Sequence, residues 1–388
     1  MIVSQLSLTD FRNYPTAEVP LVRGANLFVG KNGQGKTNLV EALGYLSTLG
    51  SHRVSSEQAM IRQGQDSAII RARLEHGDRQ LLVEVQLNRS GANRAQVNRS
   101  VIKTRELPRY FSSVLFAPED LALVRGEPSG RRRFMDELLV LRTPRISGVM
   151  ADYDRVLKQR NTLLKSARAA GIKQGQLTTL EIWDERLVAL GSELIEARTR
   201  LVAELLPEVT VAYERIAGED HHATLSNQLS IFADHPEVDS DASDGDRAGI
   251  VAAADAATAF RNSLERLRRN ELDRGITLVG PHRDDLVLHL NDMQARGYAS
   301  HGESWSFALA LKLASAELLQ REAVAGDPVL ILDDVFAELD QSRRGRLAEA
   351  ISGFEQVLIT AAVYDDVPED LRTNTVHISQ GAIVETSA

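Results

Sequence analysis

A glycine-rich loop near the N-terminus has the residue types that hold the phosphates of a nucleotide. Its sequence, GKNGQGKT, matches G-x-x-x-x-G-K-[ST] and lies between a strand-like segment at 26–29 and an amphipathic stretch. Glycines let backbone N–H groups approach phosphate oxygens, and a helix start adds partial positive charge. Lys36 is expected to reach the β- and γ-phosphates and Thr37 to ligate Mg²⁺. The predicted phosphate-binding residues are Gly30, Lys31, Asn32, Gly33, Gln34, Gly35, Lys36 and Thr37.

A pair of carboxylates later in the chain could complete this site. Four apolar residues, Val329 to Leu332, precede Asp333 and Asp334, which is typical of a buried parallel strand with an acidic end. Asp333 is expected to hold Mg²⁺, and Asp334 to orient or deprotonate an attacking water. With Lys36 they are the predicted catalytic residues. A capped strand end without chemistry is the alternative interpretation, as a plain glycine turn is for the loop.

The residues Ser300-His301-Gly302-Glu303 stand directly before a long apolar helix pattern. They resemble parts of a hydrolase site, but a Ser-His-Glu site needs groups that converge from separate elements. A phosphate clamp fits better, because Ser300 offers a hydroxyl, Gly302 permits close backbone approach and the helix start favours anions. The alternative interpretation is a helix cap formed by Ser300 or Ser304.

Composition and charge narrow the function classes. The chain has 388 residues and no cysteine, which excludes disulfides and thiol chemistry. No apolar run approaches a membrane span and the N-terminus lacks a signal-peptide pattern, so a cytoplasmic location and no membrane partner are expected. The net charge is −9, but residues 1–145 carry 21 Lys and Arg against 14 Asp and Glu. Residues 53–109 have 11 basic against six acidic residues, so this segment could bind DNA phosphates or simply face solvent.

Five further segments give the chain a family resemblance. They are LSLTDFRNY at the start, FAPEDL from Phe116, GRRRFMD from Gly130, VGPHRDD from Val279 and LDDVFAELD from Leu332. The clamp resembles the signature motif of the ATP-binding-cassette (ABC) superfamily. Together with the phosphate loop, these segments closely resemble the RecF family of recombination mediators, which is related to SMC and Rad50 heads. The resemblance covers nearly the whole chain except the acidic stretch near 234–249.

The resemblance implies a fold and an activity. The fold class would be α/β: an ABC-type (P-loop) ATPase head with mixed sheets at 1–140 and 276–388, and an inserted helical arm at 141–275 with an acidic flexible loop at about 234–249. The activity would be weak, DNA-stimulated hydrolysis of ATP with Mg²⁺. Two ATPs would be sandwiched in a head-to-tail homodimer that binds gapped DNA or a duplex junction. The partner proteins would be RecR, RecO and RecA.

The resemblance also adds candidate residues. Arg12 and Asn13 should lie near the nucleotide, Asp340 belongs to the loop that crosses the dimer interface, and Glu119 or Asp120 occupies the Q-loop region. His282 and Arg283 belong to a motif whose role the sequence does not reveal, and a structural turn with a buried salt bridge is an equal alternative.

Some positions depart from the superfamily pattern. Glu303 would repel a γ-phosphate unless it is paired or turned away, and Ala361 stands where transporters carry a switch His. A transporter-type motor subunit and a chromosome-organising SMC-like head remain the alternative functions. The first is disfavoured by Ala361 and by the missing Q-loop Gln, and the second by the absence of a long heptad run.

Overall fold

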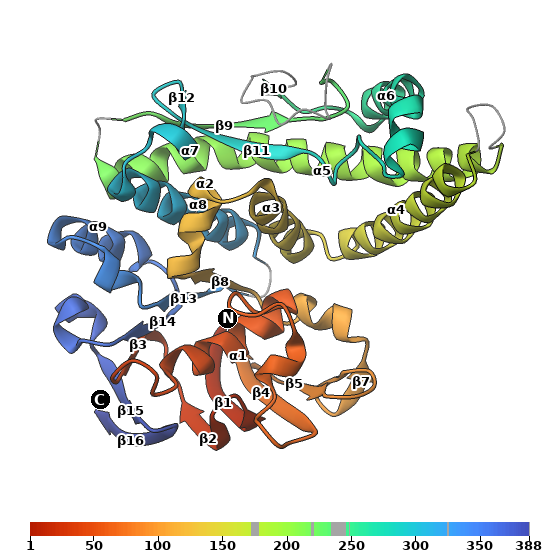
Figure 1. Ribbon diagram of the computed structural model, residues 1–388. Helices are drawn as coiled ribbons and strands as arrows, with labels where there is room; N and C mark the ends of the chain where they lie inside the picture. The colour runs from red at the N-terminus through yellow and green to blue at the C-terminus, as the bar shows by residue number, and fades with distance from the viewer. Residues whose placement is uncertain (172–177, 219–220, 234–245, 248, 324–325, 388) are drawn as a thin grey trace. The chain divides into compact units, whose positions relative to one another are not determined.

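The computed structural model describes residues 1–171, 178–218, 221–233, 246–247, 249–323 and 326–387 (Figure 1). The chain forms two compact units. Unit 1 comprises Met1–Val124, Glu208–His222 and Ala299–Ala388, and unit 2 comprises Arg125–Pro207 and Ala223–Tyr298. No helix among the described residues is long and apolar enough to cross a membrane.

The N-terminal strands of unit 1 form an antiparallel sheet in the order β2-β1-β4-β5-β6-β7. Apolar and polar residues alternate along β4 and β5, so one face of this sheet is buried and the other faces solvent. The strands are β1 (Ile2–Phe11), β2 (Tyr14–Pro20), β4 (Ser67–His76), β5 (Arg79–Asn88), β6 (Arg94–Val97) and β7 (Ser100–Ile102).

A second sheet of unit 1 has the order β16-β15-β3-β14-β13-β8, in which only β16 pairs antiparallel. Its central strands are almost continuously apolar because both faces are covered. The strands are β3 (Gly24–Val29), β8 (Ser113–Phe116), β13 (Val329–Asp333), β14 (Gln356–Ala361), β15 (Asn374–Ser379) and β16 (Ala382–Ser387). The adjacent parallel strands β3, β14 and β13 end at one edge of the sheet, which brings the segments that follow them together.

Helix α1 (Lys36–Thr48) begins directly after the loop that leaves β3. Its buried apolar residues share one hydrophobic core with both sheets. Unit 1 also contains α8 (His301–Glu322), which is buried on most sides, and α9 (Gln341–Ile351). The short α2 (Leu121–Arg125) lies at the end of the N-terminal segment of unit 1.

Unit 2 combines long helices with a four-stranded sheet in the order β10-β9-β11-β12. The helices are α3 (Pro128–Arg142), α4 (Ile146–Ala169), α5 (Thr178–Ala217, which continues into unit 1), α6 (Ala253–Arg274) and α7 (Ala295–Tyr298). The strands are β9 (Ala223–Gln228), β10 (Asp246–Arg247), β11 (Asp285–Leu290) and β12 (Met293–Gln294). The predicted helical arm at 141–275 thus contains the helices α4, α5 and α6 but also the strands β9 and β10, and most of the predicted acidic loop lies outside the described residues.

The boundaries also differ from the prediction, because residues 125–140 and 276–298 belong to unit 2. Ion pairs across these segments give the reason. Arg131 on α3 forms a bidentate pair with Asp285 at 2.8 and 2.7 Å, and Arg198 on α5 does the same with Asp136 at 2.9 Å. A third buried guanidinium, Arg160, contacts carboxylates on α5 and α6. Buried charges need such partners, so these segments are held within one unit.

The VGPHRDD motif forms a buried turn in unit 2. The His282 Nδ1 atom lies 2.8 Å from the Tyr153 hydroxyl, and Nε2 lies 3.3 Å from the Thr277 carbonyl oxygen. Gly280 has φ of 123°, and a Cβ there would lie 2.5 Å from the Phe260 ring. Burial lowers the pKa of His282 to about 3, so the imidazole is neutral. These contacts support the structural interpretation of this motif.

The pH dependence of the free energy of unfolding tests whether this turn buries a neutral His282. The unfolded chain takes up a proton near pH 6.5 and the folded chain does not, so His282 costs stability as the pH falls below 6.5. Between pH 7.5 and 5.5 the loss should be about 1.3 kcal/mol. We expect His282→Gln to lose about that much less than the unmodified chain over the same interval, as measured by urea unfolding. Equal pH dependence in the two chains would contradict the assignment. The opposite contribution of Asp284, whose pKa burial raises to about 6, is common to both chains.

Candidate nucleotide site

The phosphate loop is shaped by glycines that no other residue could replace without strain. At Gly30 a Cβ would lie 2.3 Å from the Ile378 carbonyl oxygen on β15, so the loop must pass close to the neighbouring strand. Gly35 has φ of 112°, and a Cβ there would lie 2.7 Å from the Tyr14 hydroxyl. The Gly381 N–H donates to the Gln34 carbonyl at 3.0 Å and fixes the loop to the β15–β16 turn.

The side chains that were predicted to hold Mg²⁺ meet at the edge of the second sheet. The Thr37 hydroxyl donates to Asp333 Oδ1 at 2.9 Å, and Thr360 at the end of β14 donates to the same oxygen at 2.6 Å. Two ligands on adjacent corners of an octahedral Mg²⁺ site are about 2.9 Å apart, because Mg–O distances are about 2.0–2.1 Å. Thr37 and Asp333 therefore fit the cation. Lys36 is 3% exposed and its ammonium points back to the Lys31 carbonyl at 3.5 Å.

Asp334, the residue after Asp333, has a constrained backbone and a buried carboxylate oxygen. It adopts a left-handed conformation with φ of 53°, and its N–H donates to the Thr360 hydroxyl at 3.0 Å. Its Oδ1 atom is buried and has no hydrogen-bond partner among the residues that the structure describes. Burial raises the pKa of Asp334, and Asp333 raises it further while Lys36 opposes the shift. A buried acceptor of this kind beside Thr37 and Asp333 can receive a hydrogen bond from water.

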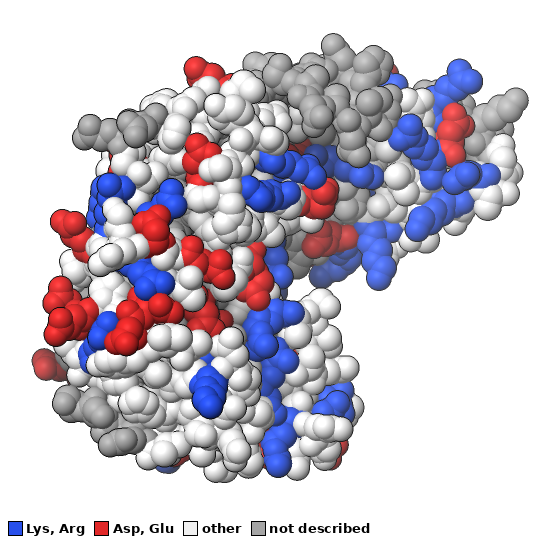
Figure 2. Space-filling view, turned by 60° about the vertical axis from the view of Figure 1, so that its left-hand side comes forward, with Lys and Arg blue, Asp and Glu red and all other residues white. Residues whose placement is uncertain are grey.

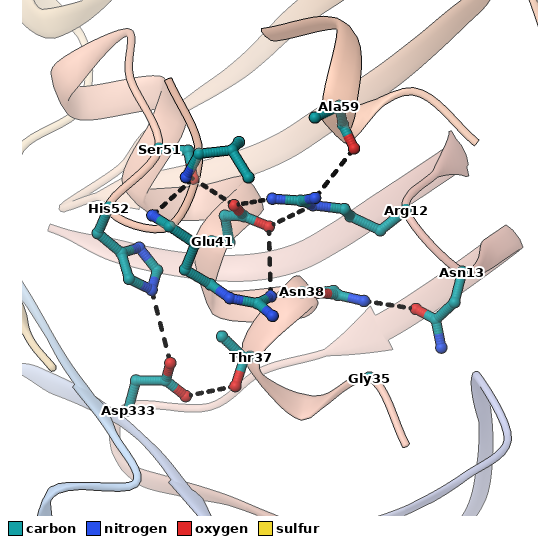
Figure 3. Close-up of polar contacts among 12 residues, drawn as sticks. Arg12, Asn13, Gly35, Thr37, Asn38, Glu41, Ser51, His52, Ala59 and Asp333 are labelled. Carbon is teal, nitrogen blue, oxygen red and sulfur yellow. Dashed lines mark hydrogen bonds and ion pairs between the residues drawn. The ribbon is translucent and has the colours of Figure 1, made fainter. Parts of the chain in front are cut away.

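Arg12 and Asn13 follow β1 and both contact α1, but of the two only Asn13 is hydrogen-bonded to the phosphate loop. The Asn13 amide donates to the Gln34 carbonyl at 3.3 Å and accepts from Asn38 at 2.7 Å. Arg12 is engaged in a bidentate pair with Glu41, with distances of 2.8 and 2.5 Å (Figure 3). Because Glu41 is fully buried, this pair is part of the structural support of the site.

An open hollow of about 500 Å³ lies in unit 1 beside the start of α1. Three guanidinium groups and several amides line it, and the Arg53 guanidinium donates to Asn38 Oδ1 at 2.8 Å. Planar cations of this kind can stack on a base or pair with phosphate. The lining residues are Arg12, Asn13, Asn38, Arg53, Gln58, Ala59, Ile61, Gln63 and Arg89.

The Ser300 segment forms a capping box in the single chain. The Ser300 hydroxyl accepts from the Glu303 N–H at 3.3 Å, and the Glu303 carboxylate accepts from the Ser300 N–H at 2.6 Å. These hydrogen bonds lower the pKa of Glu303. His221 also approaches Glu303 at 3.2 Å. The alternative of a helix cap is thus realised here, while the clamp stays a prediction.

One arginine connects the Ser300 segment with the segment after the carboxylate pair. The Arg343 guanidinium lies 2.8 Å from the position of a Cβ on Gly302 and donates to Asp340 Oδ2 at 3.1 Å. Asp340 also caps α9 by accepting from the Arg343 N–H at 2.9 Å. Gly302 therefore leaves room for a cation, and Asp340 holds that cation in place.

The Q-loop candidate Asp120 contacts α8, and the two singled-out residues of the VGPHRDD motif lie in unit 2. Asp120 pairs with Lys312 on α8 at 3.0 Å and accepts from the Ala117 N–H at 2.8 Å. It thus ties the segment after β8 to the helix that begins at His301. His282 and Arg283 belong to unit 2 and are described there.

Sequence reasoning missed Glu41, Ser51 and His52. Glu41 is a carboxylate on the buried face of an amphipathic helix, and that position was a readable signal for a paired charge. His52 Nε2 lies 3.6 Å from Asp333 Oδ2 (Figure 3). The sequence gives no signal for this contact, because long-range packing alone brings the two residues together.

Known proteins resemble the chain along its whole length. The family described as RecF/RecN/SMC N terminal domain matches residues 2–380. The DNA replication and repair protein RecF of Clavibacter sepedonicus is 67% identical over 391 residues, with 100% of this chain and 95% of that protein covered. RecF of Leifsonia xyli subsp. xyli is 66% identical over 387 residues, with 100% of both covered.

Solved structures agree with these relatives. The structure of the recombination mediator protein RecF-ATP in the RecFOR pathway matches with a TM-score of 0.86 and 27% identity, covering 100% of this chain and 97% of that one. An Smc head domain from Pyrococcus furiosus matches with a TM-score of 0.56 and 15% identity, covering 100% and 96% of the two chains, and shares the fold. The predicted α/β head with mixed sheets is confirmed.

The Arg12–Glu41 pair can be tested separately from nucleotide binding. Arg12→Met leaves a buried carboxylate without its main partner, and the free energy of unfolding should fall by about 3 kcal/mol. The double variant Arg12→Met/Glu41→Gln removes the charge and should recover at least half of that loss. Urea unfolding measures both variants. A single variant as stable as the unmodified chain would contradict the structural role.

Proposed function

The chain belongs to the RecF family, whose head has the fold of an ABC-type ATPase, and from this premise we propose that it is an ATP-gated DNA-binding protein of recombinational repair. ATP sandwiched between two copies in a head-to-tail dimer would favour binding to gapped DNA or a duplex junction. Slow hydrolysis would reset the clamp. By the same premise RecO and RecR are the proposed partners in placing RecA on DNA, and a cytoplasmic location is proposed. Ala361, in place of a switch His, gives no support to a transporter motor.

The contact between Thr37 and Asp333 carries the proposal. Their oxygens are 2.9 Å apart, directly after the phosphate loop and at the end of β13, which suits a cation that bridges phosphates. Mg²⁺, when bound with ATP, neutralises charge on the β- and γ-phosphates. Lys36 supplies a further positive charge from the first turn of α1. The buried, unpaired oxygen of Asp334 would hold the attacking water, and its raised pKa suits it to accept a proton late in the reaction.

The hollow beside α1 is the proposed place for the base and ribose. Asn13 and Asn38 offer amides at its border with the phosphate loop. Arg53 and Arg89 offer guanidinium planes, which can stack on a purine. In this arrangement Arg12 would support the hollow through Glu41 and would not donate to the nucleotide.

The dimer proposal depends on the Ser300 segment. Its hydroxyl and the N-terminus of α8 would face the γ-phosphate held by the other copy. Glu303 would be repulsive there if free, but its carboxylate already accepts from the Ser300 N–H and lies near His221. Arg343 beside Gly302 adds a positive charge at the same place. These contacts reduce the repulsion expected between the Glu303 carboxylate and a γ-phosphate, which supports the clamp.

The DNA proposal rests on exposed cations in residues 53–109. Figure 2 shows Lys and Arg side chains gathered in a run on the surface of unit 1. Two arginines of this segment are partly buried beside carboxylates: Arg62 pairs with Asp10, and Arg71 with Glu84. Two more, Arg53 and Arg89, line the hollow beside α1. The other seven are exposed and can meet phosphates without sequence preference: Arg73, Arg79, Arg94, Arg99, Lys103, Arg105 and Arg109.

A matched pair of cap variants tests the sandwich. Asp and Asn cap helices about as well as Ser, so Ser300→Asp and Ser300→Asn should fold equally. Only Ser300→Asp places a negative charge opposite the γ-phosphate, and it should lose ATP-dependent dimerisation at least tenfold more than Ser300→Asn, as measured by light scattering.

Mixing variants tests the head-to-tail geometry. Lys36→Met chains lack a working phosphate loop but keep an intact Ser300 segment. Mixed with Ser300→Asp chains, they should restore one of two composite sites and regain up to about half of the ATP hydrolysis of the unmodified dimer. Absence of any gain, with mixed dimers present, would contradict the trans arrangement.

DNA binding is measured by fluorescence anisotropy of labelled duplex and gapped DNA with ATP, with ADP and with Lys36→Met. We expect tighter binding with ATP alone and loss of that gain in Lys36→Met. The triple variant Arg94→Gln/Arg99→Gln/Lys103→Gln should reduce the salt dependence by up to about one unit of slope per residue. The charge-preserving control Arg94→Lys/Arg99→Lys/Lys103→Arg should retain it. The same affinity for DNA with ATP and with ADP would contradict ATP gating.

A further inference from the structure

A short loop after α1 brings a histidine to the carboxylate pair. The His52 Nε2 atom lies 3.6 Å from Asp333 Oδ2, and the side chain is 14% exposed (Figure 3). Nε2 itself is buried and makes no hydrogen bond within the described part of the chain. A buried ring nitrogen that faces a carboxylate oxygen just beyond hydrogen-bond distance is an unused polar contact, and such atoms are rare in folded proteins.

The loop that carries His52 is fixed on both sides of the histidine. The Ser51 hydroxyl donates to the buried Glu41 carboxylate and accepts from the N–H groups of Arg53 at 3.0 Å and Val54 at 3.2 Å. Arg53 is in turn held by Asn38 on α1. The position of the imidazole is therefore set by α1, the same helix that supplies Thr37.

The two oxygens of Asp333 have different surroundings. Oδ1 accepts from Thr37 and Thr360, whereas Oδ2 faces His52. A cation held by Thr37 and Asp333 would use a lone pair of the Thr37 hydroxyl, and the hydrogen bond from Thr37 to the carboxylate would then be lost. The orientation of Asp333 then depends on Thr360 and on whatever holds Oδ2.

We propose that His52 is a positioning residue for Asp333, with Nε2–H donating to Oδ2 and holding Oδ1 toward the cation. Hydrogen-bonded partners of this kind fix a ligand's orientation, and their loss typically costs about 10–100-fold in metal affinity. A shift of a few tenths of an ångström brings the 3.6 Å contact within hydrogen-bond range. The proposal rests on the Mg²⁺ and nucleotide site proposed above, but not on the dimer or on DNA.

Two amide variants separate positioning from simple packing. The Gln amide nitrogen reaches nearly as far as Nε2 of His, so His52→Gln keeps a donor near Asp333 Oδ2. The Asn amide ends near the position of Nδ1, so His52→Asn keeps polarity but falls short. A role in packing alone would make the shorter and the longer amide differ in stability and not in their response to Mg²⁺.

The experiment is a titration of a fluorescent ATP analogue with each chain, at zero Mg²⁺ and across a Mg²⁺ series. We expect equal nucleotide affinity for all three chains without Mg²⁺. The Mg²⁺ concentration for half-maximal tightening should rise at least tenfold in His52→Asn and stay within about threefold of the unmodified chain in His52→Gln. Hydrolysis at saturating Mg²⁺ should largely recover in His52→Asn, because the defect lies in metal affinity.

Three results would overturn the proposal. If His52→Asn has the Mg²⁺ dependence of the unmodified chain, His52 does not position Asp333, and the nucleotide site stands. If both variants lose nucleotide affinity equally with and without Mg²⁺, the loop is structural support only. If the nucleotide affinity of the unmodified chain does not depend on Mg²⁺, the proposed metal site is wrong, and the role of His52 with it.

Discussion

The site depends on one constraint, the parallel pairing of β3, β14 and β13. In this register Thr360 pairs with Phe28 on one side and with Asp333 on the other. The phosphate loop leaves β3 two residues after Phe28, while Asp333 ends β13, so segments about 300 residues apart in the chain meet at one sheet edge. Thr37 then reaches Asp333 from the first turn of α1. A sheet in which β3 and β13 lay farther apart would separate the two oxygens.

Charge balance around α1 explains which groups are structural and which are reactive. Glu41, Asp333 and Asp334 are carboxylates in one small volume, and burial penalises each of them. Glu41 is satisfied by Arg12 and Ser51. Among the described residues, Asp333 is contacted by two hydroxyl donors and by a histidine at 3.6 Å, and Oδ1 of Asp334 has no hydrogen-bond partner. Lys36 acts on Asp334, and a cation held by Thr37 and Asp333 would balance the remaining negative charge.

The predictable parts of this protein were those encoded in contiguous residues. The phosphate loop, the acidic end of β13 and the apolar strands follow from local pattern, because spacing and hydrophobicity determine them. The division into units did not follow, because it depends on pairs such as Arg131–Asp285, whose partners are far apart in sequence. His52 was missed for the same reason. Ser300 shows the opposite case, since its local pattern favoured a clamp and the single chain uses the same residues as a helix cap.

The dual nature of Ser300 has an energetic consequence for the proposed gate. In the single chain, its hydroxyl and N–H are both used by Glu303, and a helix cap of this kind is worth about 1 kcal/mol. Because the hydroxyl oxygen is an acceptor in the cap, its O–H could still donate to a phosphate while Glu303 keeps the Ser300 N–H. A hydrogen bond to a charged group contributes about 1.5–3 kcal/mol, so a correctly placed γ-phosphate would gain this energy without losing the cap. A diphosphate that ends short of the interface would gain no such hydrogen bond.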